Sequence, residues 1–325
     1  MDYLPLSDNA ARQAIDACTV FEEHARVLQE SRRFEGGMYW KRQDAYEYLV
    51  RTGRDNRQHR IGPRDAETEQ VYADFTQGKQ AVQSRLRSLT AALQEAERMN
   101  KAVKAGRVPS TVVAVLRALD DAGLGAHFTV VGTHALYAYE AAAGVRIVQG
   151  ALATQDVDLL WDARKRVRFL TALQKTQTSM LGVLQRADKS FRRKEGQNET
   201  AINDKGFEVD FLRRMAEGDD PHPFRFSDDE GDLWPVQARR ANRLAQAPVF
   251  EQIIVGANGK MARMRTVAPA DFIAFKRWLA TEAPQRPPIK RRRDQRQAEI
   301  VQGLIDEGLL IFEQNALQRL SVKLK

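Results

Sequence analysis

The stretch TQDVDLLWD, residues Thr154 to Asp162, carries two carboxylates one residue apart among side chains that are mostly apolar or β-branched. In a β-strand, residues i and i+2 point to the same face, so Asp156 and Asp158 are expected to stand side by side. Two carboxylates at that spacing repel one another. The sequence therefore predicts that a positive group lies between them.

A third carboxylate is expected in a later strand. The stretch GFEVDFLRR, which begins at Gly206, alternates apolar residues with Glu208 and Asp210, and this period of two is typical of a half-buried strand. We expect Asp156, Asp158 and Asp210 to converge on one edge of a mixed sheet. Three carboxylates could bind two Mg²⁺ ions, which prefer oxygen ligands.

A phosphate-binding turn is predicted upstream of the paired carboxylates. Residues 127–132, HFTVVG, are expected to form a short strand, and an alanine-rich helix follows up to Gly144. The N-terminus of that helix would offer unpaired N–H groups to phosphate oxygens, Gly132 would let the backbone come close, and the Thr133 hydroxyl would add a donor. His134, next in the chain, is expected to be a packed helix residue rather than an acid or base. Together with the carboxylates, this turn predicts a nucleotide site.

The first part of the chain is expected to be helical. From Asp65 to Val103 the apolar residues recur at mostly three- and four-residue steps, which predicts one long amphipathic helix. The residues up to about Leu49 are expected to form shorter helices that the Gly36–Gly37 pair interrupts. Residues 1–105 are therefore predicted to be a helical N-terminal region.

The rest of the chain is predicted to divide into a core at residues 106–236 and a C-terminal region at residues 237–325. In the C-terminal region, residues 249–267 are expected to form a hairpin with its turn near Asn258–Gly259. Two helices are expected after the hairpin, separated by a proline-rich break at residues 284–288.

The composition favours a polyanionic partner. The chain of 325 residues has a formal charge of +8 and a pI near 9.6, and its basic residues concentrate at 192–194, 213–214 and 290–296. Such runs also occur as solvated basic faces. Cys18 is the single cysteine, which excludes an internal disulfide and fits a reducing compartment. No apolar run reaches membrane-spanning length, so we expect a cytoplasmic protein.

These motifs resemble a known superfamily. Gly-Thr at the start of a helix, D-x-D in an apolar strand and a lone acidic residue in a further strand resemble the nucleotidyltransferase superfamily typified by DNA polymerase beta, although Gly-Ser or Gly-Gly is usual where this chain has Gly-Thr. The closer resemblance is to a bacterial nucleotidyltransferase-like family in which VVGTHALYAYEA, ATQDVDLL and VDFL recur, over roughly residues 35–300. It implies an α+β fold, with a mixed-sheet polymerase-beta-like core between helical N-terminal and helix-rich C-terminal regions.

The resemblance also implies roles for individual residues. Asp156 and Asp158 would ligate the metals, Asp210 would complete the site and act toward the incoming hydroxyl, and Gly132 with Thr133 would hold the triphosphate.

Two alternatives stay open at this acidic site. Glu208 shares a strand face with Asp210 and competes for the third role. Thr154 either hydrogen-bonds the nucleotide or only satisfies strand propensity.

The C-terminal region is similar to the type IV abortive-infection toxin nucleotidyltransferases. Lys276 in ADFIAFKRWL and the Arg293–Asp294 pair in KRRRD carry this similarity. In those toxins a helical lysine contacts the triphosphate and an RD pair lies next to the site. That group commonly has a further acidic residue three positions after the RD, where this chain has Gln297.

The expected function is metal-dependent transfer of NMP from an NTP to a hydroxyl acceptor with release of pyrophosphate, using two Mg²⁺ or Mn²⁺ ions. RNA such as tRNA is the preferred acceptor. Tyr39, Trp40 and the arginines near them would either add contacts to a polynucleotide or, in the case of Trp40, only anchor helices. Transfer to a protein side chain and an inactive NTP-binding regulator are the alternatives. A toxin, defence or housekeeping role and a partner protein stay open.

Overall fold

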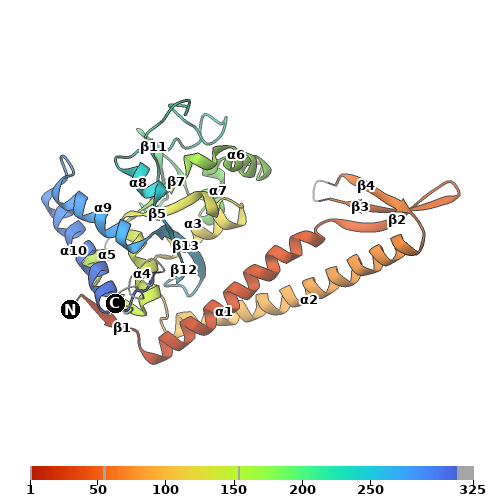
Figure 1. Ribbon diagram of the computed structural model, residues 1–325, viewed down its shortest axis with the longest axis horizontal. Coiled ribbons are helices and arrows are strands. Elements are labelled where there is room, and N and C mark those ends of the chain that lie inside the picture. Colours follow the sequence, from red (N-terminus) through yellow and green to blue (C-terminus); the bar gives the residue numbers. More distant parts are fainter. Residues whose placement is uncertain (1, 54–55, 153, 313–325) are drawn as a thin grey trace, which may run out of the picture. The chain divides into compact units, whose positions relative to one another are not determined.

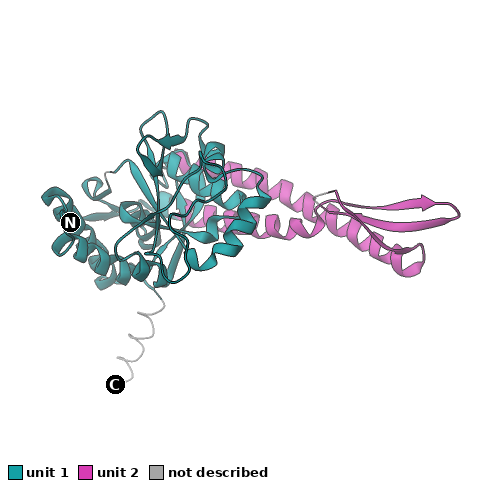
Figure 2. Cartoon of the chain, turned by 90° about the horizontal axis from the view of Figure 1, so that it is seen from above, with its two compact units in different colours: residues 1–11, 103–325 teal, residues 12–102 magenta. Residues whose placement is uncertain are grey.

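The computed structural model describes residues 2–53, 56–152 and 154–312. The chain forms two compact units: one consists of residues 12–102, and the other combines residues 1–11 with residues 103–325 (Figures 1 and 2). The fold is α+β, as the sequence predicts. Among the described residues, no helix combines the length and the apolar character needed to cross a membrane.

Residues 12–102 contain two long helices and a small sheet. Helix α1 spans Asp8–Ser31 and helix α2 spans Ala66–Ala102, so the long helix predicted from Asp65 onward is confirmed. Asp65 caps α2, because its carboxylate accepts a hydrogen bond from the Thr68 N–H at 2.8 Å while the Thr68 hydroxyl accepts one from the Asp65 N–H at 3.0 Å.

The prediction of short helices up to about Leu49 is wrong from Gly37 onward, because residues 37–63 form strands. After a 3₁₀ turn at Arg32–Phe34, these residues form an antiparallel sheet of β2 (Gly37–Gln43), β3 (Tyr46–Thr52) and β4 (Gln58–Pro63). The residues of β2 and β3 are rich in aromatic and β-branched types, which favour strands. Trp40 also packs against Tyr72 of α2 at 5.9 Å between ring centroids, so tertiary contact supports the strand conformation.

The second unit is built on a mixed sheet of eight strands. Its order is β12-β13-β5-β7-β10-β9-β8, and β11 pairs with the end of β10. The strands are β5 (Phe128–Val131), β7 (Asp156–Trp161), β8 (Arg192–Lys194), β9 (Gln197–Ile202), β10 (Glu208–Arg213), β11 (Val236–Gln237), β12 (Val249–Val255) and β13 (Met261–Val267).

The predicted hairpin of β12 and β13 is confirmed, and it belongs to the same sheet as the acidic strands. β13 runs parallel to β5, and the Thr266 hydroxyl donates a hydrogen bond to the Val130 carbonyl at 2.8 Å. The segments 106–236 and 237–325 therefore share one sheet. The basic run at residues 192–194 is the edge strand β8.

Helices lie on both sides of this sheet (Figure 1). Helices α3 (Ser110–Asp121), α6 (Arg166–Lys175) and α7 (Met180–Ala187) lie on one side, and α4 (Leu136–Ala143), α9 (Pro269–Thr281) and α10 (Pro288–Asp306) on the other. The short helices are α5 (Gln149–Leu152) and α8 (Ala241–Gln246), and β1 (Tyr3–Pro5) pairs with β6 (Val145–Ile147). Short 3₁₀ turns occur at Gly125–His127, Gly132–Ala135 and Ala163–Lys165.

An aromatic cluster fixes which face of β7 is buried. Trp161 stacks on Phe224 at 4.6 Å, and Phe128 packs edge-on against Phe211 at 5.5 Å and against Phe226 at 6.0 Å. Burying aromatic side chains contributes roughly 1.5–3 kcal/mol each. Because a one-residue slip would turn this face outward, the cluster holds Asp156 and Asp158 on the opposite face.

Candidate active site

Three carboxylates meet where β7 and β10 lie side by side. The two strands are parallel, with Asp210 level with Asp158 and Glu208 level with Asp156. One carboxylate oxygen from each of Asp156, Asp158 and Asp210 lies within 4.8 Å of the other two. The register of two neighbouring strands therefore builds the cluster that the sequence predicts.

The cluster is electrostatically strained in the absence of a cation. Burial, followed by the charges of Asp156 and Asp210, raises the pKa of Asp158 to about 7. Burial also raises the pKa of Asp210, although the Thr200 hydroxyl opposes this by donating a hydrogen bond to the Asp210 carboxylate at 2.6 Å. A cation between these groups would remove the repulsion.

The donor set suits a hard divalent cation. Carboxylate oxygens are the ligands that Mg²⁺ and Mn²⁺ prefer, and the cluster supplies three carboxylates from two adjacent strands. The three carboxylates could thus hold a divalent metal ion.

The Gly132 turn lies directly against this cluster. Val131 at the end of β5 is level with Asp158 of β7, and Gly132 follows with a positive φ of 71°. A Cβ atom at Gly132 would lie 2.2 Å from Oδ2 of Asp158, so any side chain here would displace that carboxylate. Conformation and space both favour glycine at this position. The turn continues as the 3₁₀ segment Gly132–Ala135, which leads into α4.

Gln297 of α10 holds the Thr133 side chain, a contact that no local sequence pattern predicts. The Gln297 amide Nε2 donates hydrogen bonds to the Thr133 hydroxyl at 3.2 Å and to the Ala151 carbonyl at 2.6 Å. Gln297 is fully buried, and its Oε1 has no hydrogen-bond partner among the residues that the structure describes. Because Thr133 accepts from Gln297, its own hydroxyl hydrogen is free to point elsewhere.

Lys276 and Asp294 form a buried ion pair between α9 and α10. The Lys276 ammonium lies 3.0 Å from one Asp294 oxygen, and the Arg286 guanidinium binds the other oxygen through two hydrogen bonds of 2.6 and 2.9 Å. Burial lowers the pKa of Lys276, and Asp294 opposes that effect. The positive charges of Lys276 and Arg286 partly oppose the rise in the pKa of Asp158. Arg286 is a second residue that sequence reasoning missed.

Residues 110–319 match the model of a family described as nucleotidyltransferase. The chain belongs to this nucleotidyltransferase family. Membership implies transfer of a nucleotidyl group from a nucleoside triphosphate, and the acidic cluster of β7 and β10 lies inside the matched region. Searches of curated proteins and of solved structures returned no match.

Glu208 lies outside the acidic cluster of this nucleotidyltransferase. Its carboxylate pairs with the Lys194 ammonium of β8 at 2.6 Å, whereas Asp210 is part of the three-carboxylate group. Thr154 lies beside the cluster, because its hydroxyl donates a hydrogen bond to the Asp156 carboxylate. It therefore orients a candidate metal ligand.

His134 and Arg293 lie near the candidate site but are not part of the acidic cluster. His134 is 1% exposed and packs against Tyr137 and Phe207, and burial lowers its pKa to about 4. It is neutral at physiological pH, in line with the prediction of a packed residue. Arg293 precedes Asp294 on α10 and lines a surface pocket rather than the buried ion pair.

Proposed function

We propose that this nucleotidyltransferase moves NMP from an NTP to a hydroxyl group at the 3′ end of an RNA such as tRNA, with release of pyrophosphate. The observation that carries the proposal is the contact of the Gly132 turn with the carboxylate of Asp158, within a cluster that fits divalent metals. A phosphate held at such a turn would lie beside the carboxylates that bind its counter-ions.

Asp156, Asp158 and Asp210 are the proposed ligands of two Mg²⁺ or Mn²⁺ ions. When bound, these ions neutralise phosphate charge and polarise the attacking hydroxyl. We assign the triphosphate to the backbone N–H groups that follow Gly132 and to the Thr133 hydroxyl, whose hydrogen the Gln297 contact leaves available. Lys276, which pairs with Asp294, adds positive charge that acts on Asp158.

In the proposed reaction, the acceptor oxygen forms a bond to the α-phosphorus while the bond from that phosphorus to the bridging oxygen breaks. Pyrophosphate leaves with the electrons of the broken bond. Asp210 takes the proton of the acceptor hydroxyl as the general base. The hydroxyl of Thr200 keeps the Asp210 carboxylate in place.

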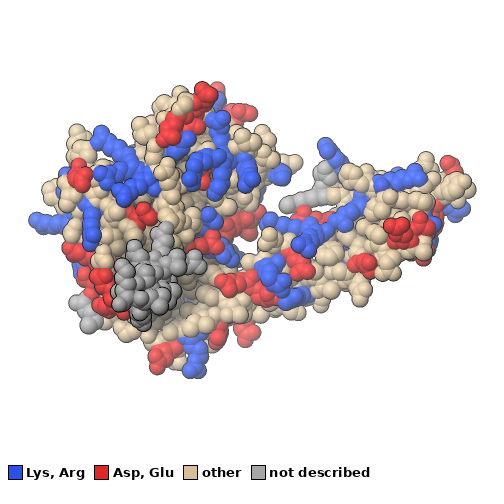
Figure 3. Space-filling model, in the orientation of Figure 1, with Lys and Arg blue, Asp and Glu red and all other residues tan. Residues whose placement is uncertain are grey.

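The charge of the chain supports RNA as the acceptor. The formal charge is +8, and a polynucleotide carries one negative charge per phosphate. Lysine and arginine side chains are prominent on the surface of the unit that holds the site (Figure 3). A protein acceptor has no comparable support from the charge of the chain.

The direct test supplies each α-labelled NTP, Mg²⁺ or Mn²⁺ and total bacterial RNA to the purified chain. Asp156→Asn and Asp158→Asn remove a candidate metal ligand each, and Glu208→Gln is the matched control on the same strand face. Label is expected in RNA with the wild type and the control, and it should be lost with both aspartate variants.

Other results would contradict the proposal. A labelled protein band in place of labelled RNA would identify a protein acceptor. Nucleotide binding with no transfer to any acceptor would identify a regulator, and transfer that survives in both aspartate variants would exclude the cluster as the reaction centre.

A further inference from the structure

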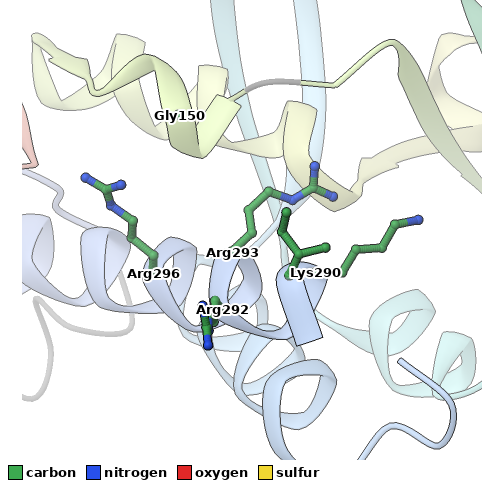
Figure 4. A pocket seen from close by; sticks show the side chains of 6 residues that line it. Gly150, Lys290, Arg292, Arg293 and Arg296 are labelled. Atoms are coloured by element: carbon green, nitrogen blue, oxygen red, sulfur yellow. The ribbon is translucent and has the colours of Figure 1, made fainter. Parts of the chain in front are cut away.

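A basic pocket lies on α10, beside α5. It has a volume of about 430 Å³ and is lined by Gly150, Ile289, Lys290, Arg292, Arg293 and Arg296 (Figure 4). Four of the six lining residues are cationic and none is acidic. The pocket is within the size range of small-ligand sites, and it is larger than a single phosphate group needs.

Helix geometry brings these cations together. Lys290, Arg293 and Arg296 follow one another at three-residue steps, so they lie along one side of α10. Figure 4 shows the Arg293 and Arg296 side chains extending from α10 toward the helix that carries Gly150. One of the four cations, Arg296, pairs with the Asp2 carboxylate at 2.7 Å. Because no acidic residue lines the pocket, its lining still carries an excess of positive charge.

A short series of contacts links the pocket to the acidic cluster. Gly150 lines the pocket, and the carbonyl of the next residue, Ala151, accepts a hydrogen bond from Gln297. Gln297 also contacts Thr133, which follows the glycine that lies against Asp158. The pocket is therefore adjacent to the Gly132–Ala135 turn, and its residues Lys290, Arg292 and Arg296 are exposed to solvent.

We propose that this pocket binds phosphodiester groups of the acceptor RNA, upstream of its 3′ end. The inference rests on the proposed function, in which the 3′ hydroxyl lies at the acidic cluster. Arginine binds phosphate oxygens through two parallel N–H groups, and three arginines with one lysine suit a run of phosphates.

The lining also indicates which part of the RNA is bound. The lining has three arginines and one lysine, which bind phosphate oxygens at any sequence, and the exposed Ile289 adds apolar contact. Arginine can also contact guanine edges, but no side-chain amide or carboxylate lines the pocket to read the other bases, so we assign it to the RNA backbone. The phosphates of the NTP already have the Gly132 turn and the metal ligands, so the pocket is assigned to the acceptor.

The experiment measures binding of a fluorescent single-stranded RNA to the full chain without NTP, over a series of salt concentrations. The test variant is Lys290→Gln with Arg292→Gln. The matched control is Arg168→Gln with Lys175→Gln, which removes the same charge from exposed positions of α6. A fluorescent NTP analogue with Mg²⁺ reports the nucleotide site separately.

The test variant is expected to bind RNA about tenfold more weakly than the control, with its affinity for the NTP analogue unchanged. The plot of log K against log salt becomes less steep by about 0.7 for each phosphate contact that is lost on a single strand. Two lost contacts should therefore reduce its steepness by about 1.4. RNA of unrelated sequence should lose the same factor.

Two results would overturn the inference. Equal RNA affinity and equal salt slope in the test and control variants would mean that the pocket does not touch the RNA. Weaker binding of the NTP analogue in the test variant alone would assign the pocket to the nucleotide. Because no transfer is needed for the readout, failure of the inference is distinct from failure of the proposed reaction.

Discussion

The Gly132 backbone lies against the Asp158 carboxylate with no room for a side chain between them. Gly132→Ala would put a Cβ 2.2 Å from Oδ2 of Asp158, at a φ of 71° that side chains rarely adopt. We expect nucleotide transfer to fall by roughly 100-fold or more, because a misplacement of about 1 Å has that effect.

Gly144→Ala is the matched control for this change. Gly144 ends α4 with a φ of 64°, and a Cβ there would meet nothing within 4 Å. The control should lose about 1–2 kcal/mol of stability and keep its activity. Equal loss of activity in the two variants would show that backbone strain alone, and not contact with Asp158, explains the effect.

The raised pKa of Asp158 predicts a pH dependence of metal binding. With a pKa of about 7, this carboxylate is about nine-tenths protonated near pH 6 and about one-tenth near pH 8. Metal must displace that proton, so we expect affinity for Mn²⁺ to rise from pH 6 to pH 8 with release of a proton. Calorimetry in two buffers of different ionisation enthalpy measures the proton release.

The raised pKa of Asp158 also makes the free energy of unfolding depend on pH, in the direction opposite to that expected for an aspartate with a lowered pKa. The folded-state pKa lies above the ordinary value, so the charged form is the one that burial penalises. Without metal, the free energy of unfolding should therefore fall as the pH rises toward 7. Asp158→Asn should reduce this dependence, and Asp120 and Asp210, whose pKa values burial also raises, account for what remains. An unchanged pH profile in that variant would assign the whole dependence to other groups.

Gln297 gives a prediction about the nucleotide. In Gln297→Glu, the buried carboxylate would accept the Thr133 hydroxyl hydrogen, which would then no longer reach a phosphate oxygen. We expect the KM for NTP to rise by about tenfold, as for loss of a hydrogen bond to a charged group. Gln302→Glu adds the same charge to α10 away from Thr133 and should leave KM unchanged. A similar rise in both variants would point to charge alone.

At the scale of elements, the α9–α10 pair depends on Asp294. Asp294→Asn would leave the ammonium of Lys276, only 2% exposed, without its counter-ion, at a cost of about 3–5 kcal/mol. Lys276→Met should cost less, because Asp294 keeps its two hydrogen bonds from Arg286. Urea unfolding of the two variants tests this order, and a larger loss in Lys276→Met would contradict it.

The pairing of β7 with β10 is the element-scale feature on which the candidate site depends. Parallel register puts Asp210 level with Asp158, and β9 on the other side of β10 supplies Thr200. Alternating patterns in the sequence predict both acidic strands. They do not reveal β9, because QNETAI has no strong strand pattern of its own.

At the scale of the whole molecule, every residue of the candidate site belongs to the unit of residues 1–11 and 103–325. In the other unit, residues 12–102, Gln13 lies near the start and donates hydrogen bonds to the Ala96 carbonyl and to Asn100, which lie near the end. The first and last residues of this unit are therefore close together. A short Gly-Ser linker can therefore replace residues 12–102.

We expect the shortened chain to fold and to bind Mn²⁺ and NTP with affinity within about threefold of the full chain, since additive behaviour is the rule for separate units. Circular dichroism checks the fold and calorimetry the binding. A folded chain that no longer binds nucleotide would show that residues 12–102 take part in the site.

The sequence by itself determined the local elements of the candidate site: the D-x-D strand, the Gly-Thr turn and the third acidic strand all lie where their local patterns predict them. Those features follow from periodicity and turn chemistry, which act over a few residues. It did not determine the sheet of residues 37–63, where packing against α2 supports strands although short helices are predicted up to about Leu49.

Only the tertiary structure decided which side chains meet. Asp210 lies with Asp156 and Asp158, whereas Glu208 forms an ion pair with Lys194 of β8. Gln297 reaches Thr133 across 164 positions of sequence, and Arg286 shares Asp294 with Lys276. These contacts depend on how helices and strands pack, and side-chain pairing between distant elements leaves no periodic trace in a single sequence.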